Sequence, residues 1–202
     1  MVRLTKQQRR AAIIVATLAV TQRKGIGATT ARDIALEMGT SSGLIHHYFA
    51  SMDTLFAAAF ETAAAADLAQ TQHAVSSALG AVAKLNAFFT SYQRTDDDWG
   101  YQLWLDAWSE ARRRPLLQTT SQRLNIQWHE LVRSIVVLGN EEQTFTCRDP
   151  DATAWRVLAL LDGLSLQVVA HPDALSYQVV MPWSMHLAEL ELGLVPDTLK
   201  IG

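Results

Sequence analysis

Small and hydrogen-bonding side chains gather within one short stretch of the chain, between Thr29 and Phe49. They are Ser41, Ser42, Gly43, His46 and His47. Residues of this kind on the surface of one helix can enter the major groove of DNA and hydrogen-bond to base edges. A short helical hairpin is also a common packing element, so spacing alone leaves DNA binding and simple packing as alternatives.

Two short helices must position these side chains, because the apolar residues of the stretch recur at helical spacing on both sides of Gly39. The apolar positions are Ile34, Ala35 and Met38 before the glycine, and Leu44, Ile45, Tyr48 and Phe49 after it. A glycine can take the left-handed conformation that ends a helix. Thr40 and Ser41 offer hydroxyls that could cap the second helix. The pattern predicts a helix-turn-helix.

The charge of the chain is divided along the sequence, although the net charge is only −3. Residues 1–60 carry seven Lys or Arg and three acidic residues, which gives +4, whereas residues 61–202 carry −7. A solvated basic face could explain the first value by itself. Its coincidence with the helix-turn-helix pattern favours a polyanionic partner for the N-terminal part.

Catalytic chemistry is a weaker interpretation. None of the six histidines has a carboxylate or second histidine at a recognised ligand spacing, and the single cysteine, Cys147, has no histidine nearby in the sequence. We therefore expect no enzyme, no cofactor and no metal. One cysteine also excludes a disulfide within the chain and fits a reducing cytosol. The apolar runs are short and interrupted by charge, so we expect a soluble, cytoplasmic protein without a membrane span.

Residues 5 to about 72 resemble the DNA-binding domain of the tetracycline-repressor (TetR) family of bacterial transcription regulators. The similarity follows the order of the motifs: an apolar first helix ending at Lys24-Gly25, the run from Arg32 to Ala35, the Gly39-Thr-Ser-Ser-Gly43 turn, and Leu44 to Phe49. A fourth helix then begins near Ser51. The resemblance implies a DNA-binding domain over residues 1–50, a connecting helix to about residue 72, and a ligand-binding and dimerisation domain over residues 51–202.

Carried over by position, the resemblance implies a set of DNA-contacting residues. Thr30 and Arg32 would touch the backbone or an adjacent base, and His47 and Tyr48 would reach phosphates. The groove-facing residues would be Ser41, Ser42, Gly43 and His46. Met52 stands where the family usually has a phosphate-contacting lysine, so charge would have to come from Arg3, Lys6, Arg9 or Arg10.

The rest of the chain predicts an all-α fold of about nine helices, because no stretch shows sustained alternation of apolar and polar residues. Residues 78–193 should form about five helices. The expected breaks lie near Gly80, at Thr95–Asp98, at Pro115, over residues 139–149 and at His171-Pro172. Pro182 should kink or interrupt the last helix.

Two acidic stretches are better explained by helix capping than by metal binding. Thr95 to Asp98 precede an aromatic helix, and Asp149 precedes Pro150, which fits the first helical position. Three consecutive carboxylates could bind a metal, but no histidine or second acidic cluster lies at ligand spacing.

Aromatic residues concentrate in the middle of the second domain, between Phe88 and Trp128. For any one of them a place in the hydrophobic core is the simpler explanation. The family resemblance, however, implies an effector pocket in this domain, and Trp and Tyr combine apolar area with one polar group. The candidate residues for an apolar or aromatic effector are Tyr92, Trp104, Trp108 and Trp128.

Residues 152–170 are apolar on nearly all sides, so this helix must be covered all round. The resemblance implies that it pairs with residues 176–192 and, together with a second subunit, forms a four-helix dimer interface. The candidate interface residues are Trp155, Leu158, Leu161, Leu166, Met185 and Leu190. Leu161 to Gln167 also resemble the choline- and betaine-responsive branch of the family.

The function that the resemblance implies is that of a repressor. A homodimer would bind a palindromic operator, because two recognition helices related by a twofold axis read two half-sites, and a small effector would release it. A helical dimeric adaptor that binds proteins is the main alternative, and an enzyme is a third.

Overall fold

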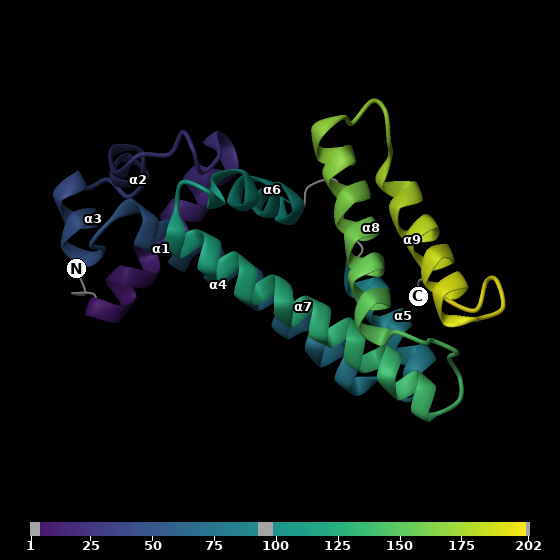
Figure 1. Cartoon of the computed structure of the whole chain (residues 1–202). Coiled ribbons are helices and arrows are strands. Elements are labelled where there is room, and N and C mark those ends of the chain that lie inside the picture. The colour runs from purple at the N-terminus through teal and green to yellow at the C-terminus, as the bar shows by residue number, and fades with distance from the viewer. Residues whose placement is uncertain (1–4, 93–98, 201–202) are drawn as a thin grey trace. The chain divides into compact units, whose positions relative to one another are not determined.

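The computed structural model describes residues 5–92 and 99–200 and shows nine α-helices and no strand within these ranges (Figure 1). The all-α prediction is therefore confirmed. Arg3 and the expected cap at Thr95–Asp98 lie outside the described residues. The helices are α1 (Lys6–Lys24), α2 (Ala31–Glu37), α3 (Ser42–Tyr48), α4 (Met52–Ser77), α5 (Ala81–Tyr92), α6 (Gly100–Ala111), α7 (Pro115–Glu141), α8 (Pro150–Ala170) and α9 (Tyr177–Leu192).

Side-chain caps explain where several helices begin. Thr5 forms a capping box with Gln8, in which the Thr5 hydroxyl accepts a hydrogen bond from the Gln8 amide and the Gln8 side chain accepts one from the Thr5 amide. Asp149 accepts a hydrogen bond from the Ala152 amide, with Pro150 in the first turn of α8. The predicted start of α8 is thus confirmed.

The expected breaks within the described residues also lie between helices. Gly80 has a positive φ of 78° and separates α4 from α5, and Pro115 opens α7. Residues 142–149 separate α7 from α8, and His171-Pro172 follow α8. Pro182 does not interrupt α9, which continues through it from Tyr177 to Leu192. A proline inside a helix removes one amide hydrogen bond and its ring crowds the carbonyl four residues earlier, a cost that packing of the helix can offset.

The chain divides into two compact units. The N-terminal unit comprises Met1–Ala65 and Gln102–Leu124, and the C-terminal unit comprises Ala66–Tyr101 and Asn125–Gly202. Most of α6 and the first part of α7 therefore belong with the N-terminal helices, which a division after residue 50 does not anticipate. The helices α4 and α7 each contribute residues to both units.

The core of the N-terminal unit joins its first four helices. Its buried residues are Ile13, Ala16 and Val20 of α1, Ile34 and Ala35 of α2, Ile45 of α3, Phe49, and Leu55 of α4. The apolar face predicted for the first half of the helix-turn-helix is confirmed at Ile34 and Ala35. In the second half Ile45 and Phe49 are buried, whereas Leu44 and Tyr48 are only partly so.

In the C-terminal unit α8 and α9 pack against each other side by side (Figure 1). Among the described helices, α8 is the one whose length and mean hydropathy of 1.3 would also suit a membrane span. Core helices of soluble proteins have the same properties, and α8 buries seven residues within its own unit. Its apolar character is accounted for in part by this packing.

Gly139 of α7 provides a test of packing in the C-terminal unit. A Cβ at this position would lie 1.9 Å from Cδ2 of the buried Phe145 ring. We expect Gly139→Ala to lower the free energy of unfolding by about 1–3 kcal/mol, because the ring must move. Chemical denaturation followed by circular dichroism measures the change.

The matched control is Gly43→Ala in α3, where the nearest atom to an added Cβ is Ser41 Oγ at 3.8 Å. That change should leave stability unchanged or raise it by up to about 1 kcal/mol, since alanine favours a helix. Equal stabilities for the two variants would contradict the packing at Gly139.

Candidate nucleic-acid interface

The helices α2 and α3 form the predicted helix-turn-helix around Gly39. Thr30 caps α2, because its hydroxyl oxygen accepts a hydrogen bond from the Asp33 amide while the Asp33 carboxylate accepts one from the Thr30 amide. Met38 ends α2, and Gly39 follows with a positive φ of 62°. The left-handed conformation at this glycine turns the chain into α3.

One face of α3 is polar and open to solvent. Its exposed residues are Ser41, Ser42, Gly43, His46 and His47. Ile45 on the opposite face is buried in the core, so the orientation of α3 is fixed. The structure thus brings together the residues that the sequence placed on the outer surface of the second helix.

Two details of α3 differ from a simple surface helix. Ser41 takes the N-cap position but its hydroxyl makes no capping hydrogen bond, so the predicted side-chain cap is wrong. The Ser41 backbone carbonyl instead accepts a hydrogen bond from the Leu44 amide at 3.0 Å. Tyr48 is half-buried and packs on the core, with its ring edge against His47 at 5.0 Å between centroids.

Arg10 of α1 holds the C-terminal end of α3. Its guanidinium donates a hydrogen bond to the Tyr48 carbonyl at 3.0 Å and lies over the Phe49 ring at 4.0 Å from the centroid. A cation at the C-terminus of a helix interacts favourably with the helix dipole, and a cation over an aromatic face is attracted by the ring. Arg10 therefore stabilises the position of α3.

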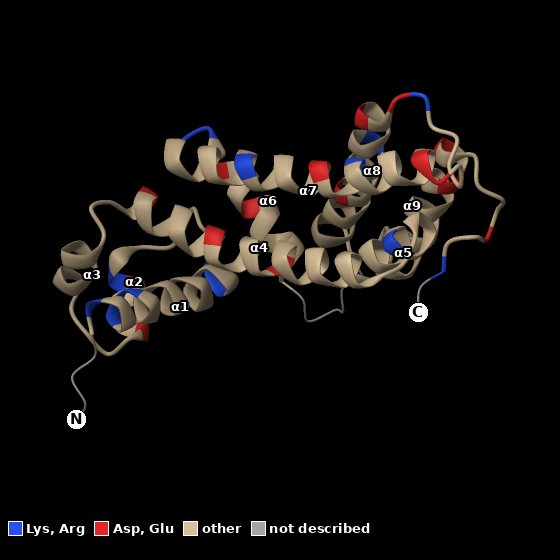
Figure 2. Cartoon of the chain, turned by 90° about the horizontal axis from the view of Figure 1, so that it is seen from below, with Lys and Arg blue, Asp and Glu red and all other residues tan. Residues whose placement is uncertain are grey.

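Apart from Arg10, the basic residues of α1 and α2, which are coloured blue in Figure 2, fall into two groups according to their ion-pair partners. Arg23 forms an ion pair with Glu37, and Lys24 forms one with Asp33 at 2.7 Å. Hydrogen bonds from Lys24 and then from Thr30 hold the pKa of Asp33 well below its usual range. These pairs join the end of α1 to α2.

Lys6, Arg9 and Arg32 form the second group. No acidic side chain among the described residues lies at ion-pair distance from them. Lys6 and Arg32 are exposed, and Arg9 is half-buried. Within the described part of the chain these three cations have no acidic partner, so they are available to an external anion such as a phosphate group.

The aromatic residues expected to bind an effector fall into two groups. Trp104 and Trp108 of α6 lie 5.4 Å apart, and Trp104 packs edge-on against Phe60, all within the N-terminal unit. Tyr92 and Trp128 belong to the C-terminal unit, where their rings lie 5.3 Å apart, and both contact Phe88.

Asp162 of α8 adds a carboxylate to the Tyr92 and Trp128 group. Its Oδ1 accepts a hydrogen bond from the Tyr92 hydroxyl at 2.9 Å. Burial raises the pKa of Asp162 to about 6, against the opposing effect of this hydrogen bond. Asp162 was not predicted from the sequence, although a lone acidic residue inside an apolar helix is a signal of function or of a specific partner.

The six residues expected at a dimer interface also divide. Leu158, Leu161 and Met185 are buried within the chain, so a second subunit could not reach them without rearrangement. Trp155 and Leu190 are exposed, and Leu166 is half-buried. Trp183 of α9, which was not predicted from the sequence, is a further exposed apolar residue of this helix pair.

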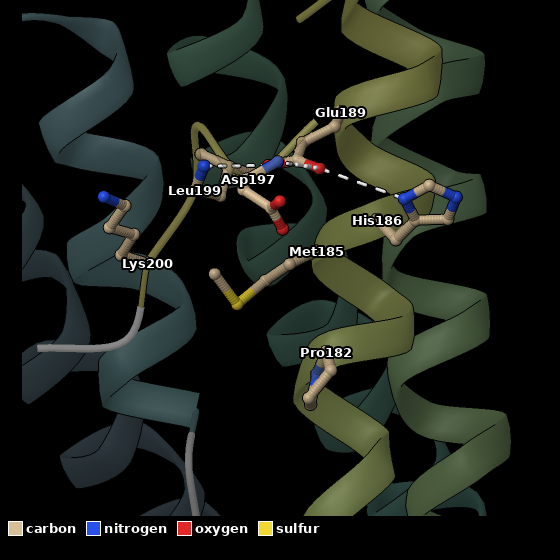
Figure 3. Close-up of a pocket in the computed structure, with 7 residues that line it drawn as sticks. All are labelled: Pro182, Met185, His186, Glu189, Asp197, Leu199 and Lys200. Carbon is tan, nitrogen blue, oxygen red and sulfur yellow. Dashed lines mark hydrogen bonds and ion pairs between the residues drawn. The ribbon is translucent and has the colours of Figure 1, made fainter. Parts of the chain in front are cut away.

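A pocket of about 400 Å³ lies beside α9 in the same unit (Figure 3). Its lining residues are Pro182, Met185, His186, Glu189, Asp197, Leu199 and Lys200. Both carboxylate oxygens of the buried Glu189 accept backbone hydrogen bonds, from Asp197 at 3.2 Å and from Leu199 at 2.8 Å. Glu189 therefore anchors the segment that follows α9.

The described residues contain no group of three or more His, Cys, Asp or Glu that could hold a metal ion.

Met52 is partly buried against the core of the N-terminal unit. Methionine is uncharged, so it cannot supply the positive charge that a lysine at this position would bring to DNA.

Comparison with known families identifies two matching regions. Residues 13–59 match the model of bacterial regulatory proteins of the tetR family, and residues 81–190 match the C-terminal domain of BetI-type transcriptional repressors. A search of curated proteins found no match.

Solved structures show the same fold over nearly the whole chain. A protein described as a transcriptional regulator from Pseudomonas aeruginosa is 27% identical, with a TM-score of 0.80 over 94% of this chain and 93% of that one. A regulator from Saccharomonospora viridis, solved in complex with choline, is 22% identical, with a TM-score of 0.83 over 92% and 98%. A TetR regulator from Haloarcula marismortui is 19% identical, with a TM-score of 0.79 over 92% and 99%.

These neighbours are transcriptional regulators and not enzymes. The matched regions include the helix-turn-helix and more than half of the chain in the C-terminal model. The chain belongs to the TetR family of transcriptional regulators, with a C-terminal domain of the BetI type.

Proposed function

We propose that this protein is a cytoplasmic repressor that binds a palindromic operator as a homodimer and releases it when a small organic cation binds. The polar, exposed face of α3 on a fixed core is the observation that carries the DNA-binding part. The cytoplasmic location follows from this proposal, because a repressor must be in the compartment that holds its operator DNA.

The DNA-contacting surface in this proposal has two parts. The groove-facing part is the exposed face of α3, with Ser41, Ser42, Gly43 and His46. Gly43 lets the backbone approach base edges closely, since it has no side chain. The phosphates would be contacted by the second group of basic residues, Lys6, Arg9 and Arg32. Thr30, His47 and Tyr48 would contribute further phosphate contacts.

We place the dimer interface on the exposed apolar residues of α8 and α9. These are Trp155, Leu166, Trp183 and Leu190. Exposed tryptophans on packed helices are typical of surfaces that a second chain covers. A twofold interface presents the same surface of each chain to the other.

The effector site in this proposal is centred on Tyr92, Trp128 and Asp162. Aromatic faces attract organic cations, and a half-buried carboxylate that has no basic partner among the described residues favours a ligand that brings positive charge. The choline complex of the S. viridis regulator supports this class of ligand. Trp104 packs on Phe60 and Trp108 packs on Trp104 in the N-terminal unit, so neither is part of the proposed centre.

Coupling between effector and DNA follows from differential binding. The helix α4 begins directly after the helix-turn-helix and continues without a break to Ser77. An effector that binds more tightly when α4 has a different orientation lowers DNA affinity by the ratio of its two affinities. A coupling of about 1–3 kcal/mol is typical and corresponds to roughly 5- to 150-fold.

The groove assignment can be tested with DNA selected from random duplexes. We expect Gly43→Ala and His46→Ala each to weaken specific binding by roughly 5- to 150-fold, the range of one lost base contact, while binding to random duplex changes little. Fluorescence anisotropy measures both affinities. His73→Ala, at an exposed position of α4, is the control. Unchanged specific affinity in both α3 variants would remove α3 from the groove.

The raised pKa of Asp162 predicts a pH dependence of stability. In the unfolded chain the carboxyl loses its proton near its ordinary pKa of 3.8, whereas in the folded chain it keeps the proton up to about pH 6. The contribution of Asp162 to stability therefore falls as pH rises between about 4 and 6, by roughly 3 kcal/mol.

Asp162→Asn should remove this fall, because the amide keeps a hydrogen-bond acceptor for Tyr92 without a charge. Urea denaturation between pH 4 and pH 7 gives the difference between the two proteins. Parallel curves would show that the carboxyl titrates normally.

The effector class can be tested with choline chloride as the probe and 3,3-dimethylbutanol as its uncharged analogue. We expect choline to change tryptophan fluorescence and to weaken operator binding, with the neutral analogue at least about tenfold weaker, as cation–π and charge contributions require. Asp162→Asn should reduce the difference between the two compounds. Equal responses to both compounds, or none, would contradict a cationic effector and would leave the DNA-binding proposal standing.

A further inference from the structure

Three consecutive arginines, Arg112 to Arg114, lie in the turn between α6 and α7. By sequence they belong to the acidic part of the chain, but the fold places them in the N-terminal unit. That unit carries eleven Lys and Arg against six Asp and Glu, so its net charge is +5, and the C-terminal unit carries −8. The division of charge thus follows the fold more closely than it follows the sequence.

The turn is fixed to the first turn of α4. The Asp53 carboxylate accepts hydrogen bonds from the amides of Leu116 at 3.1 Å and Leu117 at 3.4 Å, at the start of α7. The Arg114 guanidinium lies over the Phe56 ring at 4.7 Å from the centroid. These contacts hold the arginine turn beside the beginning of α4 (Figure 2).

At the beginning of α4 this chain lacks the positive charge that the family resemblance implies. Only residues 49–51 separate α3 from α4, so the first turn of α4 directly follows the recognition helix. The family resemblance implies a phosphate contact from a lysine at this turn, and Met52 occupies that position, packed on the core.

Internal ion pairs leave two of the three arginines accessible. Arg114 is half-buried and pairs with Glu110 at 3.2 Å. Arg113 also reaches Glu110 at 3.2 Å, but its side chain is 73% exposed. Arg112 is exposed, and no acidic partner for it is found among the described residues. A single carboxylate cannot neutralise three guanidinium groups.

We propose that Arg112 and Arg113 contact the phosphate backbone of bound DNA and supply the charge that Met52 does not. This rests on the proposed DNA-binding function of the N-terminal unit. The guanidinium group is suited to the role, because it stays charged and can donate two parallel hydrogen bonds to a phosphate. Such contacts add affinity for any duplex and do not read sequence.

The salt dependence of binding to a random duplex tests the proposal. Each phosphate contact adds about 0.9 to the slope of log K against log salt concentration, so the Arg112→Gln, Arg113→Gln double variant should lose up to about 1.8 per subunit. Its affinity at low salt should fall, and its thermal unfolding should stay unchanged. Arg133→Gln is the control, because Arg133 is a partly exposed arginine of the C-terminal unit with an i,i+3 partner, Glu130.

A rescue variant distinguishes a local contact from a general effect of charge. Met52→Lys in the double variant should restore about 0.9 of the slope, because it places a cation beside the same turn. A control lysine at exposed Gln127 of α7 in the C-terminal unit should restore none. An unchanged slope in the double variant would overturn this inference alone, whereas failure of the wild-type protein to bind any duplex would overturn the proposed function as well.

Discussion

The packing of Ile34, Ile45 and Phe49 against α1 and α4 is the constraint on which the DNA-binding surface depends. The helices α2 and α3 have seven residues each, and helices this short are not stable by themselves in water. Their apolar residues are buried together with Ile13 and Leu55. Burial of one face of α3 determines which face stays exposed, so the core sets the orientation of the residues that contact DNA in the proposed function.

The basic residues of the N-terminal unit contribute to structure and, in the proposed function, to DNA binding. Arg10, Arg23 and Lys24 form internal contacts that hold α1 to α3 and to α2. Lys6, Arg9 and Arg32 have no such partner within residues 5–92 and 99–200. The number of Lys and Arg in the sequence does not separate these two roles. The role of each cation depends on which carboxylates and carbonyls the fold brings near it.

Asp162 gives the C-terminal unit a different constraint. Burial of a carboxylate costs free energy unless a partner offsets it, and one tyrosine hydroxyl is a weak partner compared with a cation. A ligand that supplied positive charge would relieve this cost. In the proposed function the Asp162 carboxylate therefore increases the affinity for the effector and also selects an effector that is positively charged.

Local periodicity, helix caps and glycine conformation were enough to predict the all-α fold, most helix boundaries, the helix-turn-helix and its outward residues. The family resemblance added that Met52 stands where a lysine is usual. The inward positions of Leu158, Leu161 and Met185, the packing of Trp104 on Phe60, and the place of Arg112 to Arg114 beside α4 depend on tertiary packing. A helix that is apolar all round does not reveal which side its own chain covers, and residues distant in sequence meet only through packing.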